Sequence, residues 1–248
     1  MTDMNSEPMN QSSLYNLTKL RPHESAAQQS KLIDEVEFAE NQEPRCPCAL
    51  LLDTSGSMEG EPIAALNAGL REFRSDIMGD PVALKRVEVA VITFDNTVRL
   101  VQDFVTPDRF EPPVLTAQGL THMGAALHTV LDMVEQRKIR YKEAGIAYYR
   151  PWILMITDGD PLGEIPGFVE DAIRRMRRDV FTDKIVFFTV AVEGTDTIQL
   201  ARMGFDSVLK LDGLKFNELF VWLSRSMQAA TKRTGGKFSF LPTPWSKK

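Results

Sequence analysis

The sequence has few of the residues on which disulfide-rich and zinc-binding proteins depend. Its 248 residues include two cysteines and three histidines, and Pro47 separates Cys46 from Cys48. Two thiols are too few for a disulfide framework or, alone, for a tetrahedral zinc site. A bridge between them would close a very tight ring across one residue. We therefore expect two reduced thiols, and three histidines argue against a zinc hydrolase.

Long apolar runs are also missing. The longest, from Ile185 to Val192, is far shorter than the roughly 18 residues of a membrane span. The first residues are polar and lack the apolar core of a secretory signal. Together with the reduced thiols, these features predict a cytoplasmic protein without a membrane span.

Two further absences concern nucleotides and nucleic acids. The net charge of -5 argues against a general nucleic-acid binder, which usually has a basic footprint. No Gly-x-x-x-x-Gly-Lys-Ser/Thr string is present, so a P-loop is excluded. The overall composition, 43% apolar and 25% charged, is that of a globular protein with a sizeable core.

Apolar runs that are typical of buried strands alternate with amphipathic stretches along most of the chain. Expected strands are Cys46–Leu52, Val87–Phe94, Val98–Phe104, Trp152–Thr157, Ile185–Val192 and Ser207–Leu211. Expected helices are Pro62–Ile77, one after Thr121, Pro166–Arg178, Thr197–Met203 and Lys215–Lys232, with Gln136–Tyr149 as a connection. This alternation predicts an α/β fold, a Rossmann-like, doubly wound and mostly parallel sheet with helices on both faces. The short Asp95-Asn96 turn predicts one antiparallel hairpin.

Composition divides the chain into three parts. Residues 1–44 form a polar, partly mobile extension in which a short helix is expected at Glu24–Glu37. Residues 45–232 form the α/β domain, and residues 233–248 form a tail. The tail is punctuated by glycine and proline, and we expect its aromatic residues Phe238, Phe240 and Trp245 to lie against the domain.

Oxygen-bearing side chains follow three of the expected strand-to-helix junctions. Asp53, Ser55 and Ser57 come after the first strand, Thr121 precedes a helix, and Asp158 directly follows a buried strand. In a doubly wound sheet these junctions share the edge where ligands bind. Hard oxygen atoms gathered in this way suit Mg²⁺, Ca²⁺ or Mn²⁺. The pattern therefore predicts a divalent metal site made of these five side chains.

Each side chain also has a simpler interpretation. Ser57 and Thr121 are typical helix N-caps, and Asp158-Gly159 is typical of a turn. Asp53 could cap the first helix through backbone amides. The joint metal interpretation is favoured because all five residues are expected at one edge of one sheet.

The motifs Asp53-x-Ser55-x-Ser57, a later Thr121 and Thr157-Asp158-Gly159-x-Pro161 together resemble a known metal site. It is the metal-ion-dependent adhesion site of von Willebrand factor type A (vWA) domains, and the resemblance covers roughly residues 45–232. The residues after Ser57 are most similar to the bacterial TerY/YegL-like branch. They are Met58, Gly60, Ile63, Leu66, Gly69, Leu70 and Phe73.

The resemblance implies a vWA fold with one antiparallel edge strand. It also implies that Ser55, Ser57 and Thr121 hold Mg²⁺, while Asp53 and Asp158 contribute directly or through water. An Asp or Glu of a partner protein would fill the open metal position, so a protein-binding module and not an enzyme is expected. For the TerY-like branch, the implied partners are a protein kinase and a PP2C-like phosphatase of a stress- or tellurite-resistance-type system.

Enzymes remain the alternative class. A haloacid dehalogenase-like phosphatase or hydrolase also places an aspartate, here Asp53, after the first strand of such a sheet. That chemistry needs a second carboxylate two residues later, where this chain has Ser55. A serine hydrolase needs a Gly-x-Ser-x-Gly elbow with a histidine partner, and the residues around Ser55 do not supply it, although His122 is expected near this edge.

Overall fold

The computed structural model describes residues 37–192, 194–205, 208–232, 243 and 246–247. The chain divides into two units, residues 1–42 and 43–248. In the described part of the first unit, residues 37–40 are helical. The expected helix at Glu24–Glu37, apart from its last residue, and the aromatic residues of the tail lie outside the described residues. The sheet and the helices that flank it belong to the second unit.

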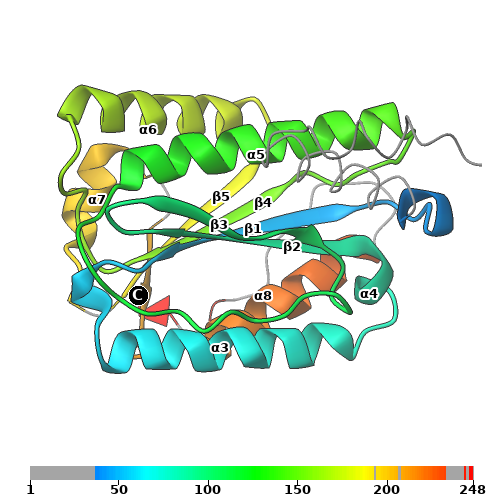
Figure 1. Ribbon diagram of the computed structural model, residues 1–248, viewed down its shortest axis with the longest axis horizontal. Coiled ribbons are helices and arrows are strands. Elements are labelled where there is room, and N and C mark those ends of the chain that lie inside the picture. Colours follow the sequence, from blue (N-terminus) through cyan, green and yellow to red (C-terminus); the bar gives the residue numbers. More distant parts are fainter. Residues whose placement is uncertain (1–36, 193, 206–207, 233–242, 244–245, 248) are drawn as a thin grey trace, which may run out of the picture. The chain divides into compact units, whose positions relative to one another are not determined.

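One seven-stranded sheet forms the centre of this unit, in the order β3-β2-β1-β4-β5-β6-β7 (Figure 1). The strands are β1 (Cys46–Asp53), β2 (Val87–Phe94), β3 (Val98–Val105), β4 (Trp152–Thr157), β5 (Val186–Ala191), β6 (Val208–Leu211) and β7 (Ser246–Lys247). Pairing is parallel from β2 through β6, and β3 runs antiparallel to β2 at one edge. The predicted fold class, a mostly parallel sheet with an antiparallel hairpin strand at its edge, is confirmed. The short β7, which pairs antiparallel with β6, was not predicted.

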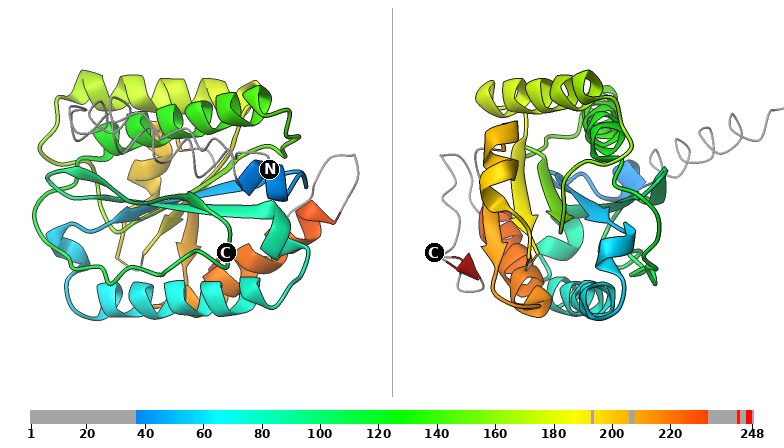
Figure 2. Two further views of the ribbon diagram at one scale, coloured as in Figure 1. Left: turned by 45° about the vertical axis from the view of Figure 1, so that its right-hand side comes forward. Right: turned by 90° about the vertical axis from the view of Figure 1, so that its left-hand side faces the viewer.

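Helices cover both faces of the sheet, with α3 and α8 on one face and α5 and α6 on the other (Figure 2). The helical elements are η1 (Gly56–Met58), α3 (Glu61–Met78), α4 (Ala83–Arg86), α5 (Met123–Glu143), α6 (Pro166–Phe181), α7 (Thr197–Met203) and α8 (Phe216–Thr231). Successive side chains of β1 pack alternately on the two faces of the sheet. Leu50 and Leu52 pack in the α3–α8 layer, and Ala49 and Leu51 in the α5–α6 layer. This double burial explains why β1 is a continuous apolar run in the sequence.

The prediction that Gln136–Tyr149 is a connection was wrong for its first half, because α5 continues to Glu143. Arg137 and Tyr141 extend the inward face of this helix, and both are buried. They reach Glu88 of β2: Arg137 Nε donates to the Glu88 carboxylate at 2.7 Å, and the Tyr141 hydroxyl donates to the same oxygen. The inward face of this half of the helix is therefore buried but polar, so apolar periodicity in the sequence does not indicate it.

The two cysteines are free and fully buried in β1. Burial raises the pKa of the Cys46 thiol to about 12, with a smaller contribution from the nearby Glu88 carboxylate. Burial also raises the pKa of Cys48 well above its usual value. Because the thiolate is the reactive form of cysteine, both side chains should be inert while the protein is folded.

We therefore expect Ellman's reagent to count two thiols after unfolding without reductant, and to react at least about a hundredfold more slowly with the native protein. The measurement is the absorbance time course with and without denaturant. A count of zero thiols in the unfolded, non-reduced protein would contradict the absence of a disulfide. Equal rates in the two conditions would contradict the burial.

Candidate metal centre

The candidate site lies where the direction of the strand order reverses. The chain leaves β1 for β2 on one side, then crosses to β4, which pairs with the other side of β1. Asp53 is the last residue of β1, and Thr157 is the last residue of β4. Ligands of open α/β sheets bind at this type of switch point, outside the carboxyl ends of the strands.

Hydrogen bonds fix the Asp53 carboxylate, which has no solvent-exposed surface. Its Oδ1 accepts from the Ser55 amide at 2.9 Å, and its Oδ2 accepts from the Thr157 hydroxyl at 2.6 Å. The second bond joins the ends of two neighbouring strands. Sequence reasoning did not assign Thr157 a role in the site, although it lies directly before Asp158 in the motif.

The hydroxyl groups of Ser55 and Ser57 extend the hydrogen bonds from Asp53 toward the protein surface. Ser55 Oγ and Ser57 Oγ are 3.1 Å apart, and Ser57 Oγ donates to Asp158 Oδ1 at 2.8 Å. Asp53 and Ser55 are buried, Asp158 is half-buried and Ser57 is exposed. Four of the five predicted site residues are thus linked by hydrogen bonds, in a chain that runs from the core to the surface.

Thr121, the fifth predicted residue, lies on a loop held against the loop after β1 and against the β2–β3 turn. The Gly119 carbonyl accepts from the Gly56 amide at 3.0 Å. The amides on either side of Thr121 are both anchored to the β2–β3 turn: Leu120 N donates to Asn96 Oδ1 at 2.6 Å, and His122 N donates to the Asp95 carbonyl at 3.0 Å. The backbone of Thr121 is therefore fixed beside the serine-bearing loop.

The helix-cap interpretation of Ser57 and Thr121 fails in this structure. Gly60 is the N-cap of α3 and His122 that of α5, and neither helix has a side-chain hydrogen bond from its N-cap. Instead, the Glu164 carboxylate accepts from the Gly124 and Ala125 amides at 2.7 and 2.8 Å. Because Glu164 caps α5 from a distant loop, the Thr121 hydroxyl is not needed for this purpose.

Burial leaves negative charge at this site without a basic side chain to balance it. Burial raises the pKa of Asp53 to about 6, although hydrogen bonds from Ser55 and Thr157 lower it. Burial also raises the pKa of Asp158, against the effect of the Ser57 hydrogen bond. Within the described part of the chain, neither carboxylate forms an ion pair with a lysine or arginine. A divalent cation would supply the missing positive charge, so the donor set fits a hard metal ion.

The described residues contain no group of three or more His, Cys, Asp or Glu side chains that could hold a metal ion. The candidate site has two carboxylates, and its other donors are hydroxyls.

Among the residues that the structure describes, no helix has both the length and the apolar character needed to cross a membrane.

The Asn96 contact gives a prediction about how the Thr121 loop is held. Gly119 has φ of +76°, and a Cβ there would lie 2.6 Å from Asn96 Oδ1. Gly145 has a similar φ of +68° but open space around it, so it is a matched control. We expect Gly145→Ala to cost about 1–2 kcal/mol of unfolding free energy through backbone strain. Gly119→Ala should cost about 1–3 kcal/mol more through the steric clash.

Urea denaturation of the two variants measures this difference. Gly119→Ala should also reduce stabilisation by Mg²⁺, whereas Gly145→Ala should leave it unchanged. Equal stability losses in the two variants would show that Asn96 does not constrain the loop.

Comparison with known families gives one match that includes this site. Residues 48–160 match the model of the von Willebrand factor type A domain. This range begins in β1 and ends just after Asp158, so it includes all five predicted site residues. No curated protein sequence matches the chain.

Several solved structures share the fold at low sequence identity. The vWF domain of the pilus tip protein Mfa5 from Porphyromonas gingivalis is 10% identical, with a TM-score of 0.56, and the match covers 79% of this chain and 99% of that one. The pilus adhesin SpaC from Lactobacillus rhamnosus GG is 12% identical, with a TM-score of 0.56 and coverages of 77% and 31%. Proximal thread matrix protein 1 from the mussel byssus, solved with a zinc-occupied MIDAS motif, is 12% identical, with a TM-score of 0.50 and coverages of 74% and 49%. The chain thus spans about half or less of the SpaC and mussel chains.

Proposed function

We propose that the protein is a metal-dependent protein-interaction module, on the basis of the match of residues 48–160 to the model of the von Willebrand factor type A domain. In this proposal, Asp53, Ser55, Ser57, Thr121 and Asp158 hold a divalent cation at the switch point of the sheet. The cation then binds a carboxylate of an Asp or Glu on a partner protein.

One observation carries the proposal: the hydrogen-bonded chain from Asp53 through Ser55 and Ser57 to Asp158. It places two carboxylates and two hydroxyls together at the carboxyl ends of adjacent strands. The oxygen atoms that make these contacts lie close enough together to bind one shared cation after small side-chain rotations. Ser57, next to Asp158 at the outer end of these hydrogen bonds, is exposed and within reach of a partner.

Charge and donor type favour Mg²⁺, with Mn²⁺ or Ca²⁺ as substitutes. All five donors are oxygen atoms, which small hard cations prefer. Two ionised carboxylates balance the charge of a divalent ion, and the hydroxyls add none. Mg²⁺ demands octahedral geometry and usually keeps several waters, so a water position would be available to an incoming carboxylate. Zinc in the related mussel structure is consistent with a divalent site in this fold.

The alternative, a haloacid dehalogenase-like hydrolase with Asp53 as nucleophile, has less support. The position of the second carboxylate is occupied by Ser55. The Asp53 carboxylate is also fully buried, and both of its oxygens accept hydrogen bonds. A carboxylate held in this way is poorly placed to attack a phosphate from solvent, so we propose a non-enzymatic role.

The finer assignments depend on the sequence alone. A cytoplasmic location is expected from the polar first residues and the two reduced thiols. The TerY/YegL-like branch, and a stress- or tellurite-resistance-type system with a protein kinase and a PP2C-like phosphatase as partners, are expected from the sequence resemblance. None of the comparisons supports that branch or these partners. A pull-down from a lysate of the source cells, with Mg²⁺ and with EDTA, followed by mass spectrometry, would identify the partner that binds through the ion.

Thr121→Ala separates binding from folding. Glu164 caps α5, so the loss of the Thr121 hydroxyl should cost the fold less than the roughly 1 kcal/mol of a lost N-cap. Loss of a metal ligand should nevertheless weaken binding of the partner recovered with Mg²⁺ by about tenfold or more. A binding titration in Mg²⁺ and a thermal melt of the same variant measure the two effects.

Thr129→Ala is the matched control, because Thr129 lies on α5, the helix that follows Thr121, and its hydroxyl donates to the Ala125 carbonyl of that helix. It should bind the partner like the wild type. If Thr121→Ala also binds like the wild type, or if the wild type binds equally well in EDTA, then docking does not depend on this ion.

A further inference from the structure

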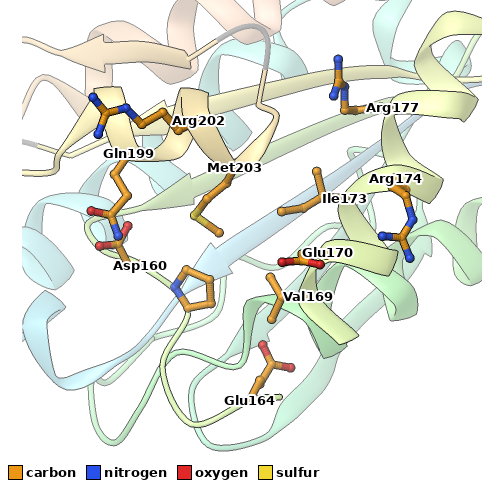
Figure 3. A pocket seen from close by; sticks show the side chains of 11 residues that line it. Asp160, Glu164, Val169, Glu170, Ile173, Arg174, Arg177, Gln199, Arg202 and Met203 are labelled. Atoms are coloured by element: carbon orange, nitrogen blue, oxygen red, sulfur yellow. The ribbon is translucent and has the colours of Figure 1, made fainter. Parts of the chain in front are cut away.

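A cavity of about 630 Å³ lies beside the candidate metal site, lined by α6, α7 and the loop after β4 (Figure 3). Val169 and Ile173 of α6 and Met203 of α7 point toward one another at its centre. Its volume is within the usual range of ligand pockets. Charged side chains also line it: Asp160, Glu164, Glu170, Arg174, Arg177 and Arg202.

Asp160 provides a polar group that lacks a partner. It lines the cavity, and its Oδ1 is shielded from solvent and accepts no hydrogen bond from any described residue. A buried oxygen in this state needs a donor to offset the loss of hydration. Glu164, by comparison, is already occupied by the α5 amides. Asp160 as a whole is half-buried, so its carboxylate also offers accessible acceptor surface to an N–H group that enters the cavity.

The position of the cavity connects it to the metal site. Asp160 is two residues from Asp158, so the two Cα atoms are at most about 7 Å apart. Between them and α6 lie Leu162 and Ile165, whose side chains are 59% and 76% exposed. Both apolar residues are therefore accessible to a partner.

We propose that this cavity is a side-chain pocket for the same partner segment that gives its carboxylate to the metal ion. The inference rests on the proposed function. The segment carries an Asp or Glu and, two to four residues away in extended conformation, a large apolar side chain such as Leu, Met or Phe. The apolar side chain enters between Val169, Ile173 and Met203, and a backbone N–H of the segment donates to Asp160.

The spacing follows from geometry. An extended chain advances about 3.3 Å per residue, so two to four residues reach about 7–13 Å from the residue that binds the ion. Burial of a leucine-sized side chain contributes enough free energy to raise affinity about tenfold or more. The metal would therefore select for an acidic residue, and the cavity would select the sequence around it.

Selection from a phage-displayed library of short random peptides tests the inference. The full-length protein is immobilised in millimolar Mg²⁺, and bound phage are eluted with EDTA. One enriched peptide is then synthesised in three forms: unchanged, with its acidic residue as the amide, and with its apolar residue as serine. Fluorescence anisotropy measures the affinity of each form.

Two protein variants locate the contact. Gln199 lies on α7, is exposed and lines the cavity, so Gln199→Trp should fill the cavity without disturbing the core. Ala201 is exposed on the same helix and does not line the cavity, so Ala201→Trp is the matched control.

We expect enriched peptides to share an acidic residue and a large apolar residue at a fixed spacing. Gln199→Trp should weaken their binding about tenfold, and Ala201→Trp should not. Mg²⁺-dependent peptides without a shared apolar position, or unchanged binding by Gln199→Trp, would overturn the pocket and leave metal docking intact. Failure to enrich any EDTA-eluted peptide would overturn both the metal docking and the pocket that depends on it.

Discussion

Glu88→Gln should destabilise the protein by about 3–5 kcal/mol, the cost expected when one partner of a buried ion pair is removed. The Glu88 carboxylate is fully buried and lies 3.4 Å from Arg45 Nε and 2.7 Å from Arg137 Nε. It also accepts the Tyr141 hydroxyl. Glutamine keeps the shape but removes the charge that balances two buried guanidinium groups. The melting temperature should fall by about 10 °C or more.

Urea denaturation compares this variant with Glu135→Gln. Glu135 pairs with Lys138 at 2.7 Å on the same helix as Arg137, but its side chain is 48% exposed. An exposed pair of this type contributes about 0–1 kcal/mol. If Glu88→Gln is no more destabilising than Glu135→Gln, the buried cluster does not stabilise the junction of β2 and α5.

Mg²⁺ or Mn²⁺ should stabilise the folded protein, and Asp53→Ala should remove most of this effect. A ligand that binds only the native state adds about 2.7 kcal/mol at a hundredfold excess over its dissociation constant. For a domain of this size, that corresponds to an increase of about 5–10 °C in melting temperature. Thermal melts in EDTA and in millimolar Mg²⁺ measure this increase in melting temperature, which we call the metal increment.

The metal increment must be compared within each variant, because Asp53→Ala also changes the metal-free protein. It removes a carboxylate that accepts bonds from Ser55 and Thr157, but it also relieves the burial of that charge and its repulsion with Asp158. Asp132→Ala is the control, since Asp132 is an exposed aspartate of α5 that pairs with Arg175. It should keep the full metal increment. Identical wild-type melts with and without metal would remove the basis for the metal site.

Much of the fold was predictable because central parallel strands are buried on both faces. β2 and β4 begin and end at the predicted residues, Val87–Phe94 and Trp152–Thr157. Their apolar runs are bounded by polar or turn-forming residues, so the pattern also indicates where they stop. The order of strands and helices then brings the oxygen-bearing junctions to one edge.

The remaining features depend on contacts between residues far apart in the sequence. The second half of α5 is helical, but its inward side chains Arg137 and Tyr141 are polar because they meet Glu88 across the fold. The local sequence suggested Thr121 as the cap of α5. The cap is Glu164, which is about 40 residues away and therefore not visible in the local pattern. In the same way, only the register of β1 against β4 shows that the Thr157 hydroxyl meets Asp53.

The most direct test of the metal site is a Mn²⁺ titration followed by electron paramagnetic resonance, in which the signal of free Mn²⁺ reports binding. We predict that the wild type binds one Mn²⁺ per chain and that Mg²⁺ displaces it. We further predict that a variant with both Ser55→Ala and Ser57→Ala binds at least about tenfold more weakly while it remains folded. A wild type that binds no Mn²⁺, or a double variant that binds it equally well, would contradict a cation held by these residues.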